Sequence, residues 1–121
     1  MLYYLNNCQN LRHAEIYGAG AIYDLWAKGF EEKIAEEMAP DDLCIVASRA
    51  GKEMVSFACY RFTSARKVPN PSGGKPDIWV LEGTLDEEVV MPRLEAIHRA
   101  PYSRFFNVLG HFNQWSVERG A

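Results

Sequence analysis

The sequence predicts an α+β fold, a partly open β-barrel with short flanking helices. Strand-forming runs dominate the second half, the connections between them are short, and two short helical segments interrupt them. A chain of 121 residues is long enough for one hydrophobic core and too short for two. We therefore expect a single domain that spans residues 1–121.

The sequence pattern is clear for the first predicted element and mixed for the second. The opening MLYYL is rich in strand formers and is bounded by two asparagines, which predicts a short strand over residues 1–5. Residues 11–23 are compatible with a helix, but Gly18 and Gly20 interrupt them. A turn or a bent helix is expected there.

The segment FEEKIAEEM predicts an amphipathic helix. Phe30, Ile34 and Met38 recur every four residues on one face, and the glutamates occupy the other. Pro40 closes the helix, because proline cannot continue it. We interpret the glutamate-rich face as solvated surface rather than as a metal site.

The periodicity changes to that of strands after Pro40. The runs Leu43 to Arg49 and Met54 to Phe62 predict an antiparallel hairpin with a tight turn at Gly51. VPNPSGGKP, residues 68–76, combines three prolines with two glycines and is expected to be an exposed, mobile loop.

The remaining elements follow in the order strand, helix, strand. DIWVLEG, residues 77–83, predicts a buried strand, with Trp79 packed in it. MPRLEAIH, residues 91–98, has Pro92 where a helix can begin, so a short helix is expected. NQWSVER, residues 113–119, predicts the last strand.

Charge and cysteine usage limit the classes of function. Thirteen basic and sixteen acidic residues give a net charge of −3, so any contact with nucleic acid must depend on a local patch.

Three cysteines without a CxxC pair, and no histidine at metal-ligand spacing, indicate a reduced, cytoplasmic setting with no metal or other cofactor. Cys44 and Cys59 lie in apolar runs and are expected to be buried, inert thiols. Neither a signal peptide nor a membrane-spanning run is apparent.

The order of elements resembles the PUA-like barrels and, within them, the EVE domains. In that family a strand, a Trp before a helix, a "GD-hydrophobic" strand and a "GK-hydrophobic" return strand precede a long strand, a Pro-led helix and a Ser-Val ending. The corresponding segments here are MLYYL, Trp26 ahead of FEEKIAEEM, APDDLCIVAS, AGKEMVSFACYRF, DIWVLEG, MPRLEAI and QWSV. Asp41 stands where the family has glycine, and LWAKGF replaces the polar pair that follows its Trp.

The resemblance implies a nucleic-acid-binding reader domain that holds a modified base of RNA or DNA in an aromatic pocket. A base taken out of its stack needs aromatic faces and a few hydrogen-bonding groups at its edge. The candidate ligand-binding residues are Trp26, Ser48, Arg49, Lys52, Asn107 and His111.

Each candidate also has a purely structural interpretation. Trp26, whose partners in a pocket would be Tyr23 and Phe30, can instead be a core residue. The strand-end and turn candidates can be solvated. Asn107 and His111 lie in the aromatic stretch PYSRFFNVLGHFNQWSV, residues 101–117, which can serve the core as well as a pocket wall.

Two other functions stay open. ASCH domains share the PUA-like fold, and some hydrolyse modified nucleosides with Lys, Thr and Glu; Lys52, Thr63 or Thr84, and Glu82 are available here. A small-molecule- or protein-binding barrel would suit the acidic charge. The sequence has no GxSxG, HExxH or phosphate loop. Clustering of the basic residues on one face would favour nucleic acid: Arg49, Lys52, Arg61, Arg66 and Lys67.

Overall fold

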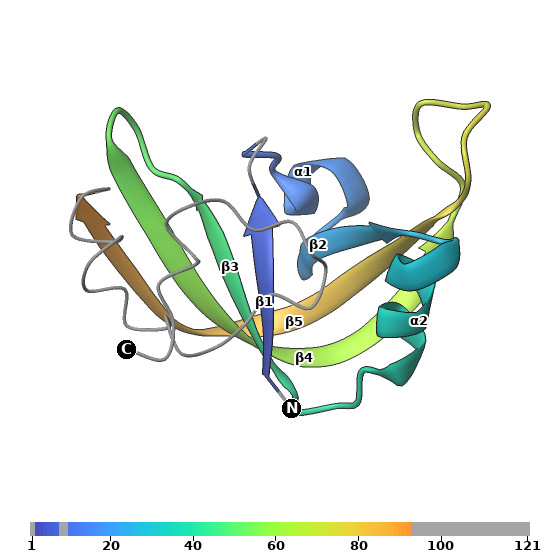
Figure 1. The fold of residues 1–121 in the computed structure, drawn as a ribbon, viewed down its shortest axis with the longest axis horizontal. Coiled ribbons are helices and arrows are strands. Elements are labelled where there is room, and N and C mark those ends of the chain that lie inside the picture. The colour runs from blue at the N-terminus through green and yellow to red at the C-terminus, as the bar shows by residue number, and fades with distance from the viewer. Residues whose placement is uncertain (1, 8–9, 93–121) are drawn as a thin grey trace.

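A computed structural model describes residues 2–7 and 10–92, which form an α+β fold built on one five-stranded sheet (Figure 1). The sheet curls into a half-barrel, so the predicted class and the barrel-like curvature are confirmed. In chain order the elements are β1 (Leu2–Asn7), α1 (His13–Tyr17), β2 (Ala21–Trp26), α2 (Gly29–Glu37), β3 (Leu43–Arg49), β4 (Met54–Val68) and β5 (Ile78–Pro92).

The strands lie in the order β1-β3-β4-β5-β2. β1 is parallel to β3, and the other neighbouring pairs are antiparallel. The predicted hairpin is confirmed, because Leu43 pairs with Arg61 and Arg49 pairs with Val55. Gly51 in its turn has a φ of +90°, a conformation that glycine adopts without steric cost.

β4 and β5 are longer than the sequence predicted, with 15 residues each. Two irregularities in their pairing lie at Cys59/Tyr60 and Phe62/Ser64, and bulges of this kind bend and twist a strand. Gly83 pairs with Phe62 at the second bulge, where an added Cβ would lie 2.6 Å from the carbonyl oxygen of Arg61. The sheet therefore bends at a place where only glycine fits.

Two predictions near the ends of β5 and α1 need correction. Pro92 does not begin a helix, because Met91 and Pro92 are the last residues of β5 and pair with β4. Residues 93–98 and the predicted last strand lie outside the described residues. Residues 11–23 are not one bent helix, but the alternative of a turn is confirmed: α1 ends before Gly18, a turn follows at residues 19–20, and β2 begins after Gly20. The strand was missed because the glycines mark a change of element and not a bend within one.

The core lies inside the curl of the sheet and under α2 (Figure 1). Buried apolar side chains from both helix and sheet form it: Tyr3, Leu5, Ile22, Tyr23, Leu25, Ile34, Ala35, Met38, Cys44, Val46, Phe62 and Leu81. Trp79 packs against this cluster, as expected from the sequence. Cys44 and Cys59 are buried as predicted, and burial raises the pKa of the Cys44 thiol to about 12.

α2 uses a different face from the predicted one. Ile34 and Met38 are buried, but Phe30 is 56% exposed. The buried stripe runs through Ile34 and Ala35, and a turn of 3.6 residues places Phe30 about 90° from its centre. The predicted apolar face was therefore wrong at Phe30.

The glutamate-rich face of α2 is not all plain surface. The indole N–H of Trp79 on β5 donates a hydrogen bond to Oε2 of Glu32 over 3.0 Å, and Lys67 Nζ lies 3.3 Å from the same oxygen. These contacts attach the helix to the sheet. In the part of the chain that the structure describes, neither helix is long and apolar enough to cross a membrane.

Candidate ligand pocket

A pocket with a volume of about 760 Å³ lies between α1, β2 and the loop that joins β4 to β5. In Figure 1 α1 and the loop lie along the upper side of the molecule, and β2 runs below them. Its size is typical of small-molecule sites. The main lining residues come from α1 (His13, Ile16, Tyr17), from β2 (Tyr23, Asp24, Trp26) and from the loop (Asn70, Pro71, Ser72, Lys75).

A hydrogen-bonded group of three side chains connects α1 to β2 in this pocket. The hydroxyl of Tyr17 donates to Oδ2 of Asp24 over 2.6 Å, and His13 Nε2 lies 3.4 Å from Oδ1 of the same carboxylate. His13 and Tyr17 are four residues apart on α1, so their rings stack, with an interplanar angle of 10°. One turn of helix thus presents both groups to the carboxylate on the strand.

The hydrogen bonds determine the charge state of this group. Burial raises the pKa of Asp24, but the hydrogen bonds from His13 and Tyr17 outweigh burial and leave that pKa below its ordinary value. Burial, together with the bond to Asp24, raises the pKa of the Tyr17 hydroxyl. At neutral pH Asp24 is therefore an ionised carboxylate and Tyr17 a neutral donor.

α1 has only five residues and depends on outside contacts to hold its place. The side-chain amide of Asn7, at the end of β1, bonds to both the N–H and the carbonyl of Leu11. Nη2 of Arg66 on β4 donates to the carbonyl oxygen of Tyr17 over 2.6 Å. The helix that carries His13 is thus anchored at both ends.

Trp26 forms the aromatic part of the pocket rim. It is the last residue of β2 and is 40% exposed, so the interpretation of Trp26 as a core residue is wrong. Its backbone N–H donates to Oε1 of Glu31 over 3.1 Å. Lys28 Nζ lies 5.5 Å from the centre of the ring, a distance at which a cation attracts an aromatic face.

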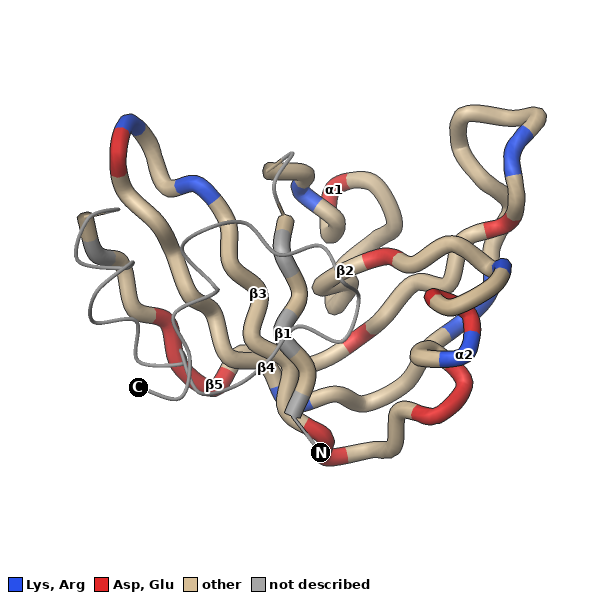
Figure 2. The backbone as a smooth tube through the Cα atoms, in the orientation of Figure 1, with Lys and Arg blue, Asp and Glu red and all other residues tan. Residues whose placement is uncertain are grey.

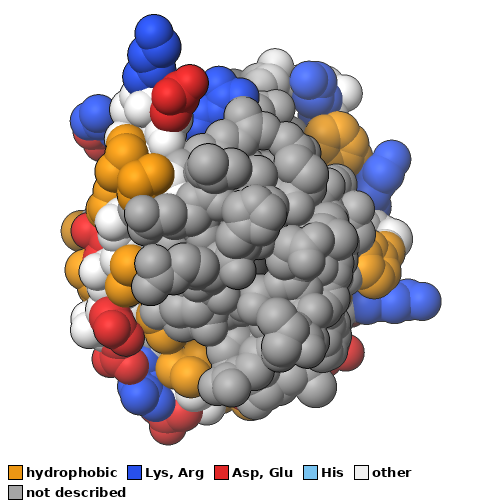
Figure 3. Space-filling view, turned by 60° about the vertical axis from the view of Figure 1, so that its left-hand side comes forward, with side chains coloured by type: hydrophobic (Ala, Val, Ile, Leu, Met, Phe, Trp, Pro, Cys, Tyr) orange, Lys and Arg blue, Asp and Glu red, His pale blue; other side chains and the backbone are white. Residues whose placement is uncertain are grey.

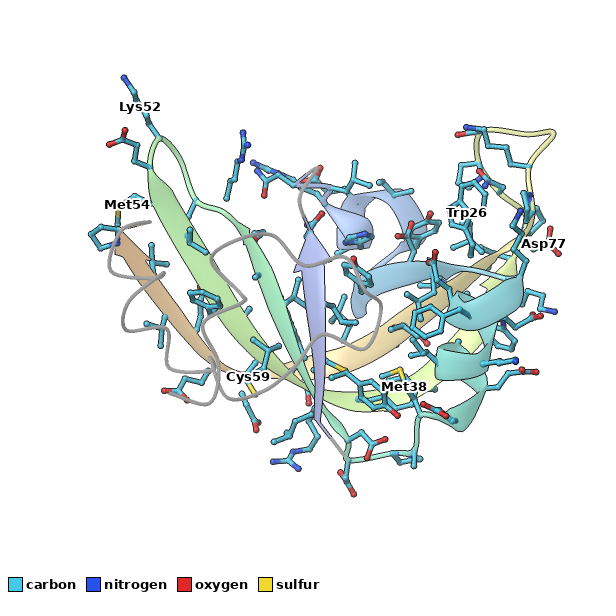
Figure 4. All side chains as sticks on the ribbon, in the orientation of Figure 1. Trp26, Met38, Lys52, Met54, Cys59 and Asp77 are labelled. Carbon is cyan, nitrogen blue, oxygen red and sulfur yellow. The ribbon has the colours of Figure 1, made fainter. Side chains whose placement is uncertain are left out.

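The loop after β4 forms the wall opposite α1 and is exposed, as predicted. Asn70 holds it together, because its amide donates to the carbonyl of Pro76 and its oxygen accepts from the N–H of Ser72. The N–H of Ala27 donates to the carbonyl of Asp77, which joins the end of the loop to the end of β2. The loop base is thus fixed beside Trp26 (Figure 4).

Of the sequence-predicted candidates, the structure places Trp26 in the pocket. Ser48 pairs with Asn7, which lines the pocket. Ser48 therefore lies near the edge of the pocket but does not line it. Arg49 ends β3 and Lys52 lies in the hairpin turn, and Figure 4 shows Lys52 at the opposite end of the molecule from Trp26. Asn107 and His111 lie outside the described residues.

Sequence reasoning missed three residues: His13, Tyr17 and Asp24. Two signals were present. The first is the four-residue spacing of a histidine and a tyrosine, and the second is a single aspartate inside the apolar run AIYDLW. Neither indicated a site without knowledge that AIYDLW is a strand beside α1.

Three of the five basic residues that would mark a nucleic-acid surface are paired with carboxylates. Arg61 pairs with Asp86 at 3.0 Å and Arg66 with Glu82 at 3.4 Å, and Lys67 pairs with a carboxylate on α2. Figure 2 shows acidic and basic residues side by side around α2 and the adjoining strand. On the face seen in Figure 3, the described Lys and Arg side chains are scattered among acidic and apolar ones.

The Lys, Thr and Glu arrangement of a hydrolase is not brought together either. Lys52 precedes Met54, which pairs with Pro92, whereas Glu82 lies ten residues earlier on β5. At about 3.3 Å per residue that separation is on the order of 30 Å along the strand. Within residues 2–7 and 10–92, no group of three or more His, Cys, Asp or Glu residues is placed to hold a metal ion.

Comparison of the chain with protein-family models, with curated proteins and with solved structures finds no match.

Proposed function

We propose that this protein is a binding domain whose pocket takes a flat polar ligand of the nucleobase class, with a base presented by RNA or DNA as the form suggested by the EVE-like order of elements. The observation that carries the proposal is the presence of an exposed indole, Trp26, and an ionised hydrogen-bonding group, Asp24, in one pocket. The curled sheet and the position of Trp26 ahead of α2 support a PUA-like, EVE-like classification, and the free thiols of Cys44 and Cys59 support a cytoplasmic setting.

The two groups would contribute differently. Stacking on an aromatic side chain contributes about 1–3 kcal/mol per base and tolerates any base, because every base has a π-face. A hydrogen bond to a base edge distinguishes one base from another. Trp26 would therefore supply affinity, and Asp24 would supply selectivity.

The test is a calorimetric titration of the protein with nucleosides and with short single-stranded oligonucleotides, each with and without modified bases. Trp26→Ala should weaken binding about five- to 150-fold, which corresponds to the lost stacking contact. Phe30→Ala is the matched control: Phe30 is another exposed aromatic residue, and it does not line the pocket.

Absence of binding up to near-millimolar concentrations, in every arm, would refute the proposal. Equal losses of affinity in Trp26→Ala and Phe30→Ala would show that Trp26 is not part of the binding site.

A free small ligand is the second candidate. It is favoured by the ion pairs of Arg61, Arg66 and Lys67, because cations already paired with carboxylates contribute little to a phosphate backbone. Binding of nucleosides that is as tight as binding of oligonucleotides would support this form. Tighter binding of oligonucleotides would support the reader domain.

A further inference from the structure

Asp24 has hydrogen-bonding capacity that its own contacts do not use. Its side chain is 23% exposed, and Asp24 lines the pocket. An ionised carboxylate offers about four acceptor sites on two oxygens. Tyr17 occupies one site on Oδ2, His13 one on Oδ1 and the backbone N–H of Asp24 a third, so one site remains for a further donor.

The neighbouring contacts hold this carboxylate in place. His13 is 5% exposed and lies with its ring centre 5.3 Å from that of Tyr23, so it cannot swing away without disturbing the core. Tyr17 belongs to a helix that Arg66 fixes at its last residue. A ligand in the pocket therefore meets a fixed acceptor rather than a mobile side chain.

Resting on the proposed function, we propose that Asp24 makes the pocket selective for heterocycles that present a hydrogen-bond donor, in particular an exocyclic amino group, at the edge that enters it. An N–H group that donates to an ionised carboxylate forms a charge-assisted hydrogen bond, which is stronger than a bond between two neutral groups. A carbonyl or unprotonated ring nitrogen at the same place would set lone pair against lone pair.

The other charged groups at the pocket act in opposite directions. Glu31 and Lys75 also line the pocket, so one further acidic side chain is balanced by one basic side chain. The Glu31 carboxylate accepts from the backbone N–H of Trp26 at the rim. Glu31 and Lys75 change the electrostatic potential of the pocket as a whole. They do not replace Asp24 as the fixed hydrogen-bond acceptor beside α1.

The test uses matched pairs of nucleosides in the same calorimetric assay. Guanosine and inosine differ only in the exocyclic amino group, whereas cytidine and uridine carry an amino group and a carbonyl, respectively, at the same ring carbon, beside an unprotonated N3 in cytidine and an N3–H in uridine. The wild-type protein should bind the amino-bearing member about ten- to a hundredfold more tightly, the range for a hydrogen bond to a charged group. Asp24→Asn should reduce that ratio to near one, whereas Glu31→Gln, at the other lining carboxylate, should preserve it.

The outcomes separate this inference from the proposed function. Binding of all four nucleosides without a preference for the amino-bearing ones overturns the inference and leaves the proposed function standing. Loss of the preference in Glu31→Gln instead of Asp24→Asn overturns the assignment to Asp24. Absence of binding by all four overturns the inference, and it overturns the proposed function as well if the oligonucleotide arms also show no binding. The wild-type ratios decide the matter even if Asp24→Asn fails to fold.

Discussion

Asp24 shows how a single charged residue is accommodated in an apolar strand. It lies in AIYDLW, where its neighbours Tyr23 and Leu25 are buried in the core. A carboxylate in such a place is costly unless hydrogen bonds compensate for the lost hydration. The donors on α1 supply these bonds, so the short helix and the strand stabilise each other through this one residue.

The lowered pKa of Asp24 predicts a dependence of stability on pH. Its folded pKa lies below the unfolded value of about 3.9, so the unfolded chain binds the proton first as the pH falls. The contribution of Asp24 is therefore complete above that value and is lost as the pH falls toward the folded pKa. In urea unfolding, the stability difference between the wild type and Asp24→Asn should be constant above about pH 5 and shrink below about pH 4. A difference that grows on acidification would contradict this sign.

Gly83 provides a second prediction at the residue scale. A Cβ at this position would lie 2.6 Å from the backbone oxygen of Arg61, an atom that cannot rotate away. Gly83→Ala should therefore lower the free energy of unfolding by about 1–3 kcal/mol, as overpacking does. Thr84→Ala, on the next and exposed residue of β5, should have a much smaller effect in the same denaturation assay. Equal effects would show that the bulge adapts to a side chain.

Among the elements, the loop between β4 and β5 combines an exposed tip with a fixed base. Asn70 bonds to Pro76 across the loop, and the N–H of Ala27 holds Asp77. The tip residues are exposed. The fixed base explains how a loop rich in proline and glycine forms one wall of a pocket.

Deletion of residues 72–74 should separate these two properties. The melting temperature should fall by only a few degrees, because the deletion removes little buried surface. Ligand affinity should fall as well, because Ser72 lines the pocket. Thermal unfolding and the nucleoside titration, performed on the same variant, measure the two effects. Collapse of the fold would show that the tip is structural, and unchanged affinity would exclude it from the site.

For the whole molecule, the elements with strong local signals were predictable and the pocket was not. The alternation of apolar residues around Gly51 specified the hairpin and its pairing, since side chains in a strand alternate between faces. The length of β5 and the beginning of β2 depend on pairing between distant strands, which no local pattern encodes. The pocket combines α1, β2 and the loop after β4, and only the curl of the sheet brings them together.

The distribution of charge over the molecule predicts weak salt dependence. Among the described residues, the three basic side chains of β4 are paired with carboxylates, so this strand offers few free cations to phosphates. With about one phosphate contact, raising the salt concentration fourfold should lower the affinity for an oligonucleotide only about three- to fourfold. A loss of a thousandfold or more, measured by the same titration at 50 and 200 mM salt, would indicate a backbone-binding surface instead.

The most direct test of the proposed pocket is a nuclear magnetic resonance titration that follows the indole N–H signals of the tryptophans, assigned by single Trp→Phe substitutions. Trp26 lines the pocket, whereas the indole N–H of Trp79 is bonded to Glu32 on α2. On addition of guanosine or another amino-bearing nucleoside, the Trp26 signal should move in a saturable manner while the Trp79 signal stays in place. A Trp26 signal that does not move up to near-millimolar nucleoside, or a shift confined to Trp79, would contradict the pocket as the binding site.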